Sequence, residues 1–293
     1  MIEIGDFRIS RVEEMVLDED PSLLKHFDDE ILAAHRDWLV PDFYVAERNC
    51  FRTMIHAWIL RTPDRTIVID TAGGDDKDRP LSPRFHKLKT GFDQRLAAAG
   101  VDPAEVDMVL LTHLHVDHVG WNTKLDGDRW VPMFPNAQYV VSGTELAARD
   151  PERGAREKPP ASWGPYLDSV KPILDAGMMR IVEGDETILP GIDLVPVPGH
   201  APGMMGIRVR DGGKEAFFIA DVMHQPIQIH YPAWNSKYCE NQDLAAETRA
   251  KVLRHAADVG ALLLPAHFCG PTCGYARPVS GGGYAFEAPQ QRP

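Results

Sequence analysis

The sequence predicts a layered α/β protein, with β-sheets inside and helices outside. Two observations predict this class. Short apolar, β-branched runs alternate with stretches of helical pattern along most of the 293 residues, and clusters of Gly and Pro separate them. Hydrophobic residues make up 44% of the chain and charged residues 25%, which is ordinary for a globular protein with a sizeable core.

The first hundred residues are predicted to be mostly strand. Residues 1–45 form an N-terminal extension, in which the strand-like "FRISRVEEMV" precedes an acidic, helix-like piece. The segment "FRTMIHAWILRTPDRTIVIDTAGG" predicts a β-hairpin, because two apolar runs flank the turn "TPDR", and the second run ends at Asp70. A helix is expected over "FHKLKTGFDQRLAAAG", with Gly100 at its C-terminal end.

A strand–helix rhythm continues toward the C-terminus. We expect strands at "DMVLLTH", "NAQYVVS", "IDLVPVPG", "KEAFFIAD" and "ALLLPAH", and a helix over "QDLAAETRAKVLRHAADVG". Residues 151–176 are rich in Pro and charge and are interpreted as a surface excursion, either a lid or a plain loop. The whole chain, 1–293, is interpreted as a single domain that ends in a frayed tail at 286–293.

The net charge of −12 argues against nucleic acid as the main partner, since nucleic-acid binding draws on clustered Lys and Arg. No window approaches the roughly 20 apolar residues that a membrane span needs. The start "MIEIGDFRIS" lacks the basic and apolar regions of a signal peptide, so a cytoplasmic location with reduced cysteines is expected. The expected partner is a small-molecule substrate, with the N-terminal extension as a candidate arm of a homodimer.

The stretch "LLTHLHVDHVGW" concentrates metal-ligand types at a predicted strand end. In an extended chain His113, His115 and Asp117 alternate in phase and point to one side. Two imidazoles and a third ligand suit one tetrahedral zinc ion. Asp117 and His118 do not easily join that same ion, which suggests a second ion beside it.

Three further ligand-type residues follow apolar strands elsewhere in the chain. His200 lies in "VPVPGHAPGMMG", Asp221 ends "AFFIAD", and His267 ends "ALLLPAH". A single histidine at a strand end is more often a structural residue. The C-terminal ends of strands are, however, where α/β folds place their sites, and the recurrence of this position indicates a metal centre.

Together these motifs, H-x-H-x-D-H, P-G-H-x-P-G, an Asp after an apolar strand and a late L-P-x-H, resemble the pattern of the metallo-β-lactamase-fold superfamily over about residues 50–285. The resemblance implies an αββα sandwich of two mixed sheets with helices on both outer faces. It also implies a ligand set. One metal would be bound by His113, His115 and His200, a second by Asp117, His118 and His267, with Asp221 bridging the two and Asp70 orienting a ligand imidazole.

Two adjacent divalent ions lower the pKa of a shared water from about 15.7 toward neutrality. The site therefore predicts a hydrolase that attacks a small lactone or ester with a metal-bound hydroxide. Asp117 is the candidate to orient the hydroxide or carry its proton. Zinc is favoured, although manganese, cobalt and iron accept the same ligands.

The branches of the superfamily differ at some ligand positions, and these differences narrow the choice of reaction. Asp221 instead of Cys disfavours the zinc β-lactamases, and His115 instead of Glu disfavours the flavodiiron oxygen reductases. The chain is most similar to the lactonase and organophosphate-hydrolase branch. Related lactonases carry a Tyr three residues after the bridging Asp, where this sequence has His224; either His224 replaces that donor in catalysis or the substrate differs.

Other readings of the site stay open. The alternatives are a phosphotriesterase-like or glyoxalase II-like thioester hydrolase and, less favoured, a mononuclear iron oxidoreductase. Small-molecule sites are mostly apolar, and four residues near the ligand motifs are interpreted as lining such a pocket: Trp121, Phe134, Met223 and Trp234.

Overall fold

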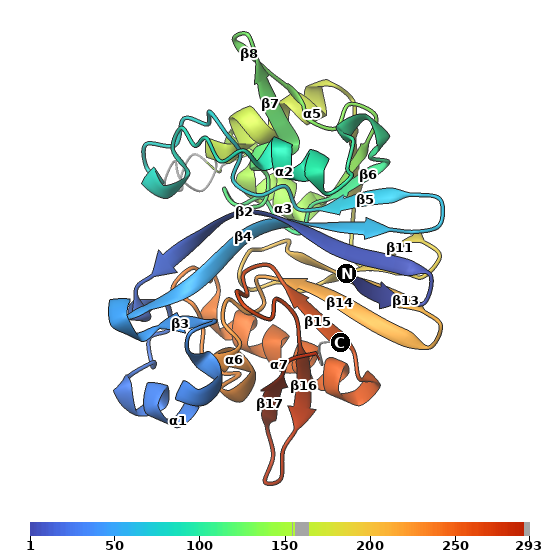
Figure 1. Ribbon diagram of the computed structural model, residues 1–293. Coiled ribbons are helices and arrows are strands. Elements are labelled where there is room, and N and C mark those ends of the chain that lie inside the picture. The colour runs from blue at the N-terminus through green and yellow to red at the C-terminus, as the bar shows by residue number, and fades with distance from the viewer. Residues whose placement is uncertain (154, 156–163, 290–293) are drawn as a thin grey trace. The chain divides into compact units, whose positions relative to one another are not determined.

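The structure is a computed structural model that describes residues 1–153, 155 and 164–289. The chain forms two compact units whose segments alternate in sequence (Figure 1). Unit 1 comprises Met1–Met15 and Ile55–Glu186, and unit 2 comprises Val16–Met54 and Thr187–Pro293. The single domain expected over 1–293 stays a prediction.

The larger sheet lies mostly in unit 1 and has eight strands in the order β1-β2-β4-β5-β6-β9-β10, with β3 paired to β4. The predicted hairpin is confirmed, because β4 and β5 pair antiparallel, whereas β5, β6, β9 and β10 run parallel. The C-terminal ends of β5 and β6 therefore lie side by side. The bounds are β1 (Ile2–Ile4), β2 (Phe7–Glu19), β3 (Tyr44–Val45), β4 (Cys50–Arg61), β5 (Thr66–Ile69), β6 (Met108–Leu110), β9 (Gln138–Ser142) and β10 (Met179–Val182).

The described part of unit 1 also contains a separate hairpin and the helices α2, α3 and α5, with the bounds β7 (Thr123–Asp126), β8 (Arg129–Pro132), α2 (Phe92–Ala98), α3 (Gly143–Arg149) and α5 (Lys171–Asp175). The helix predicted from Phe85 is shorter than expected. Gly91 precedes α2 with φ 68°, a left-handed conformation that a helix cannot contain. Of the predicted excursion, residues 154 and 156–163 lie outside the described residues.

Unit 2 is built on a five-stranded sheet of order β11-β12-β13-β14-β15. Strands β12, β13 and β14 pair antiparallel, and β15 joins β14 in parallel, with a bulge between Phe218 and Ala220. Phe286 and Glu287, placed in the predicted tail, instead pair with β16 as part of β17. The bounds are β11 (Glu186–Leu189), β12 (Ile192–Pro196), β13 (Met205–Asp211), β14 (Lys214–Ala220), β15 (Leu262–Pro265), β16 (Tyr275–Pro278) and β17 (Tyr284–Glu287).

Three helices cover parts of unit 2: α1 (Asp29–Leu39), α6 (Ile227–His230) and α7 (Gln242–Val259). Side chains cap the longer ones, since Asp28 accepts the Ile31 N–H and Asn241 accepts the Leu244 N–H. Gly260 then ends α7 as predicted, with φ 69°. Helix α7 packs on β14 and β16, and α6 packs on β17. The core between these elements includes the buried side chains of Phe43, Phe51, Leu253 and Phe268. Burial of each such large apolar side chain stabilises the folded state by roughly 1.5–3 kcal/mol.

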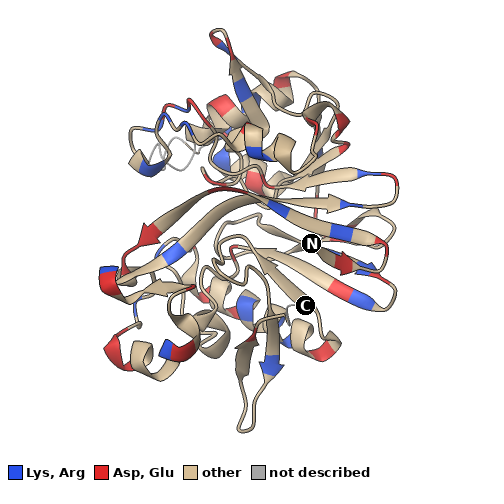
Figure 2. Ribbon diagram, in the orientation of Figure 1, with Lys and Arg blue, Asp and Glu red and all other residues tan. Residues whose placement is uncertain are grey.

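Charged residues are mixed along the described chain. In Figure 2 the Lys and Arg positions are interspersed with acidic and uncharged ones instead of following one element. None of the described helices combines the length and the apolar character that crossing a membrane requires.

An aromatic and histidine cluster joins α1, α6 and β17 within unit 2. The Trp38 indole N–H donates to His35 Nδ1 at 3.2 Å, and the backbone N–H of Phe286 donates to His230 Nε2 at 3.2 Å. The Trp38 ring also stacks on His230, with 5.0 Å between the ring centroids. Both histidines therefore accept a hydrogen bond, which only an unprotonated ring nitrogen can do.

This cluster predicts a loss of stability in acid. Burial lowers the pKa of His230 to about 4 and also lowers the pKa of His35. The unfolded chain binds protons near pH 6.5, so the cluster stabilises the fold above that pH and ceases to do so as the pH falls toward 4. His230→Gln should flatten the decline in unfolding free energy between about pH 7 and pH 4, measured by urea denaturation. The exposed His26→Gln is the control, and a parental slope in His230→Gln would refute the assignment.

Candidate metal centre

In unit 1, the predicted ligands follow the C-terminal ends of two parallel strands. Asp70 comes directly after β5, and its backbone N–H donates to the carbonyl of Leu110, the last residue of β6. The expectation that His113, His115 and Asp117 point to one side because they alternate along a strand is wrong. Strand β6 ends at Leu110, and these residues lie in the loop that follows. A turn closed by the His118 N–H to the His115 carbonyl, 3.1 Å, brings this segment together instead.

The Asp70 carboxylate is buried and ties this loop down. One oxygen accepts the Thr112 backbone N–H at 2.8 Å, and the other accepts the Thr112 hydroxyl at 2.7 Å and lies 2.8 Å from His118 Nδ1. Asp70 thus contacts an imidazole of the predicted ligand set, which is the contact that the resemblance implied. The carboxylate of Asp70 accepts a hydrogen bond from His118 Nδ1, so in the neutral ring Nδ1 carries the hydrogen. The other ring nitrogen, Nε2, then has a lone pair and lies 3.8 Å from the Asp117 carboxylate.

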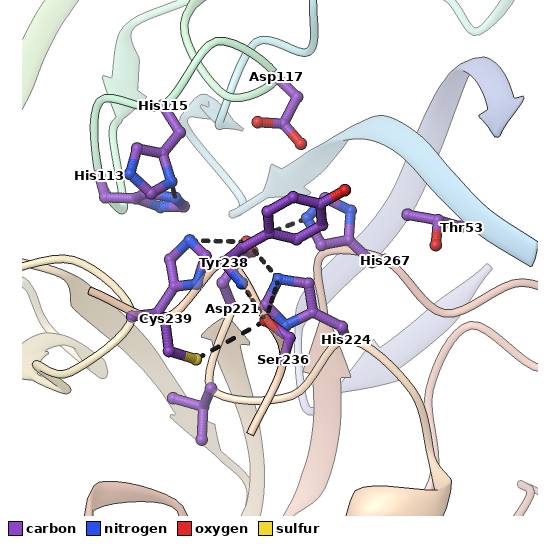
Figure 3. Close-up of polar contacts among 12 residues, drawn as sticks. Thr53, His113, His115, Asp117, Asp221, His224, Ser236, Tyr238, Cys239 and His267 are labelled. Atoms are coloured by element: carbon purple, nitrogen blue, oxygen red, sulfur yellow. Dashed lines mark hydrogen bonds and ion pairs between the residues drawn. The ribbon is translucent and has the colours of Figure 1, made fainter. Parts of the chain in front are cut away.

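The other two histidines of this loop face each other. His113 Nε2 and His115 Nδ1 are 3.1 Å apart (Figure 3). The far side of the His115 ring meets the buried guanidinium of Arg149, 3.0 Å from Nε2. Arg149 pairs with the buried Glu145 of the same helix, and Glu145 also accepts the Leu114 N–H at 3.3 Å. Sequence reasoning missed this pair, although the i,i+4 spacing in "ELAAR" was a usable signal.

In unit 2, Asp221 forms the centre of a second set. The bulge in β14 ends at Ala220 with φ 47°, and this turn carries Asp221 out of the strand. Three imidazole nitrogens surround one carboxylate oxygen, Asp221 Oδ2: His200 Nε2 at 3.2 Å, His224 Nε2 at 3.4 Å and His267 Nε2 at 3.1 Å. All four side chains are buried. Their arrangement around Asp221 can be followed in Figure 3 for His224 and His267.

The donor chemistry of this set fits a metal ion. His267 Nδ1 lies 3.0 Å from the Met54 carbonyl oxygen, which can only accept, so Nδ1 carries the hydrogen. Nε2 of the neutral ring then presents a lone pair to Asp221 Oδ2. Two acceptors 3.1 Å apart repel each other unless a proton or a cation lies between them. His200, Asp221 and His224 also form a group whose ligand atoms lie within 4.8 Å of one another.

His224 has supports that the sequence did not reveal. Its backbone N–H donates to the buried Gln228 side chain at 2.7 Å, and its Nε2 lies 3.4 Å from the Ser236 hydroxyl. Arg249 of α7 is fully buried and donates to the Val222 carbonyl at 2.8 Å, holding the chain next to Asp221. Burial lowers the pKa of Arg249 to about 10.

The four predicted pocket residues are placed as follows. Trp121 is buried and stacks on Phe92, with ring centroids 5.4 Å apart. Phe134 and Met223 are fully buried, and Trp234 stacks on Tyr231 at 4.2 Å. These contacts are with the protein's own side chains, so a substrate pocket stays a prediction.

Comparison with known proteins gives one family match and several relatives. The model of the metallo-beta-lactamase superfamily matches residues 51–267. The N-acyl homoserine lactonase AttM of Rhizobium radiobacter is 30% identical over 174 residues, covering 52% of this chain and 58% of that protein. The N-acyl homoserine lactonase AiiA of Bacillus thuringiensis subsp. kurstaki is 30% identical over 109 residues, covering 37% and 34%. The chain thus matches between a third and three fifths of the length of these relatives.

Solved structures match over the full chain. The hydrolase AbOPH of the beta lactamase superfamily superposes with a TM-score of 0.83 at 24% identity, covering 100% of this chain and 97% of that one. AidC, described as a dizinc quorum-quenching lactonase, gives 0.77 at 20% identity, with the same coverage. These likenesses confirm the mixed α/β fold that the motifs implied.

Proposed function

The chain belongs to the metallo-β-lactamase superfamily, and on that premise we propose that it is a dinuclear metal-dependent hydrolase of small lactones or esters. One observation carries the proposal. In each unit, an imidazole whose Nδ1 already has a hydrogen-bond acceptor turns its Nε2 toward a carboxylate, as His118 does toward Asp117 and His267 toward Asp221. Structural histidines have no need of such opposed acceptors, whereas metal ligands do.

The ligand assignment that the motifs imply is proposed unchanged. One ion takes His113, His115 and His200, the other takes Asp117, His118 and His267, and Asp221 bridges them. Its support is that neighbouring residues already orient these side chains inside their own units: Asp70 holds His118, Arg149 contacts His115, and Met54 holds His267. Zinc is favoured among the divalent ions, and AidC is described as dizinc.

Bound divalent ions would lower the pKa of water toward neutrality and polarise a carbonyl oxygen. The chain's own residues supply the remaining steps. The Asp117 side chain is 19% exposed, against 2% for the neighbouring His118, so it can accept a proton from water and release it to solvent. His224, buried beside Asp221, is the proposed donor to the substrate oxygen.

Lactones are favoured among the substrates because AttM and AiiA are named N-acyl homoserine lactonases. His224 stands where related lactonases carry Tyr, so phosphotriesters and thioesters remain the alternatives. The net charge of −12 supports a small molecule over nucleic acid as the partner. We further propose a cytoplasmic enzyme, with residues 1–45 as the dimer contact.

A substrate panel tests the proposal on one metal-loaded preparation. We expect hydrolysis of γ-lactones or aryl esters at neutral pH, with kcat/KM at least about tenfold above that for thioesters and phosphotriesters, a difference of about 1.4 kcal/mol in transition-state binding. The same protein after chelation is the control. If the enzyme prefers a thioester or a phosphotriester, the proposed substrate class is wrong. If the protein holds a single iron and consumes oxygen, it is an oxidoreductase and the proposed hydrolysis is wrong.

A further inference from the structure

Glu14, on the N-terminal strand β2, is a buried carboxylate that accepts hydrogen bonds from three N–H groups. Its Oε2 accepts the Gly73 N–H at 2.7 Å. Its Oε1 accepts the Trp121 indole N–H at 2.7 Å and the Gly74 N–H at 3.1 Å. Glu14 is 5% exposed, and burial raises its pKa against the opposing effect of these donors. So many donors on one buried acid indicate a specific task.

The three N–H donors belong to two loops, of which one carries Asp70, the predicted support of a ligand imidazole, and the other carries predicted metal ligands. One loop follows β5 and begins with Asp70, and the other follows His118. Backbone hydrogen bonds join them: the Thr71 N–H donates to the His118 carbonyl at 2.7 Å, and the Trp121 N–H donates to the Thr71 carbonyl at 2.9 Å. Glu14 therefore contacts both loops at the far end of this ladder, on residues that are not themselves ligands.

The first loop has an unfavourable backbone. Asp70 has φ 55° and Ala72 has φ 50°, a left-handed conformation that non-glycine residues rarely adopt. Such a conformation is unfavourable and persists only when neighbouring contacts hold it. Glu14 makes two of those contacts, on the next two amides after Ala72.

We propose that Glu14 is a positioning residue, which holds the two loops in register so that Asp70 keeps His118 directed at its metal. The proposal rests on the proposed function, since it concerns the same ligands. A glutamine cannot replace this group, because N–H donors face both carboxylate oxygens. Whichever way the amide is turned, its NH₂ meets another donor.

The test compares Glu14→Gln with two controls. Val12→Ala removes buried apolar volume from the same strand and lowers thermal stability without removing a hydrogen-bond acceptor of the loops. Glu13→Gln changes an exposed neighbouring carboxylate. In Glu14→Gln we expect the affinity for the more weakly held metal to fall about tenfold to a hundredfold, and kcat to fall with little change in KM. The visible spectrum of the cobalt-substituted protein should change as well, and neither control should show these effects.

Amide hydrogen exchange in the metal-free chain provides a measurement that does not depend on the reaction. Glu14→Gln should accelerate exchange in residues 70–74 and 118–122 beyond what Val12→Ala does. If both variants exchange alike there, Glu14 is only structural and the proposal fails, whether or not the parent binds metal. A parent that binds no metal but shows the loop-specific exchange would instead refute the proposed function. Should Glu14→Gln not fold, Trp121→Phe removes one of the hydrogen bonds and should act in the same direction with a smaller effect.

Discussion

Asp221→Ala is expected to strip metal from the protein and to lower hydrolysis by at least about a thousandfold, while the chain stays folded. Three imidazoles lie within 3.4 Å of Asp221 Oδ2, and removing this carboxylate leaves them without the anion that would balance a divalent cation. His113→Ala removes a proposed ligand of unit 1 and should give the same phenotype.

Metal content by mass spectrometry, circular dichroism and turnover on one preparation measure this effect. Asp258→Ala, at an exposed position of α7, is the control and should match the parent in all three. Turnover at the parental rate in purified Asp221→Ala would show that the ligand assignment is wrong. If Asp221→Ala does not fold, the same measurements on His113→Ala test the assignment.

Gly120→Ala is expected to have the second largest effect. A Cβ on Gly120 would lie 1.8 Å from the carbonyl oxygen of Gly73, and this oxygen belongs to backbone that cannot turn away as a side chain would. Overpacking of this kind typically lowers the free energy of unfolding by up to about 3 kcal/mol. Because the Gly120 N–H also donates to the Ala72 carbonyl, relief of the clash must separate the two loops that carry Asp70 and His118.

Urea denaturation and metal titration of Gly120→Ala check this expectation. Gly164→Ala is the matched control: among the described residues its Cβ would meet nothing within 4 Å, so the unfolding free energy of this variant should change by less than about 1 kcal/mol. A Gly120→Ala protein with parental stability and parental metal affinity would show that the close packing of the two loops is not required.

Much of the fold was predictable because its elements are locally determined. The hairpin of β4 and β5 and the long helix α7 follow from apolar runs, a polar turn, and caps at Asn241 and Gly260. Local pattern failed where backbone conformation decides the outcome. Gly91 makes α2 begin later than its apolar periodicity suggested, and strand β6 stops at Leu110 although apolar and β-branched residues continue beyond it.

The candidate ligands were predictable from their residue types and strand-end positions, but their supports were not. Glu14 and Arg149 act through space on loops distant in sequence, and no spacing rule connects them to those loops. One signal was present: Val12 and Glu14 share the buried face of β2, and an acid in phase with buried apolar residues requires donors from elsewhere.

The most direct test of the central claim is titration of the metal-free chain with zinc while lactone hydrolysis is followed. The proposed dinuclear site predicts two equivalents bound per chain, with activity restored as the second equivalent binds and lost again on chelation. Full turnover by the metal-free chain, or saturation of binding and activity at one equivalent, would contradict a dinuclear hydrolase.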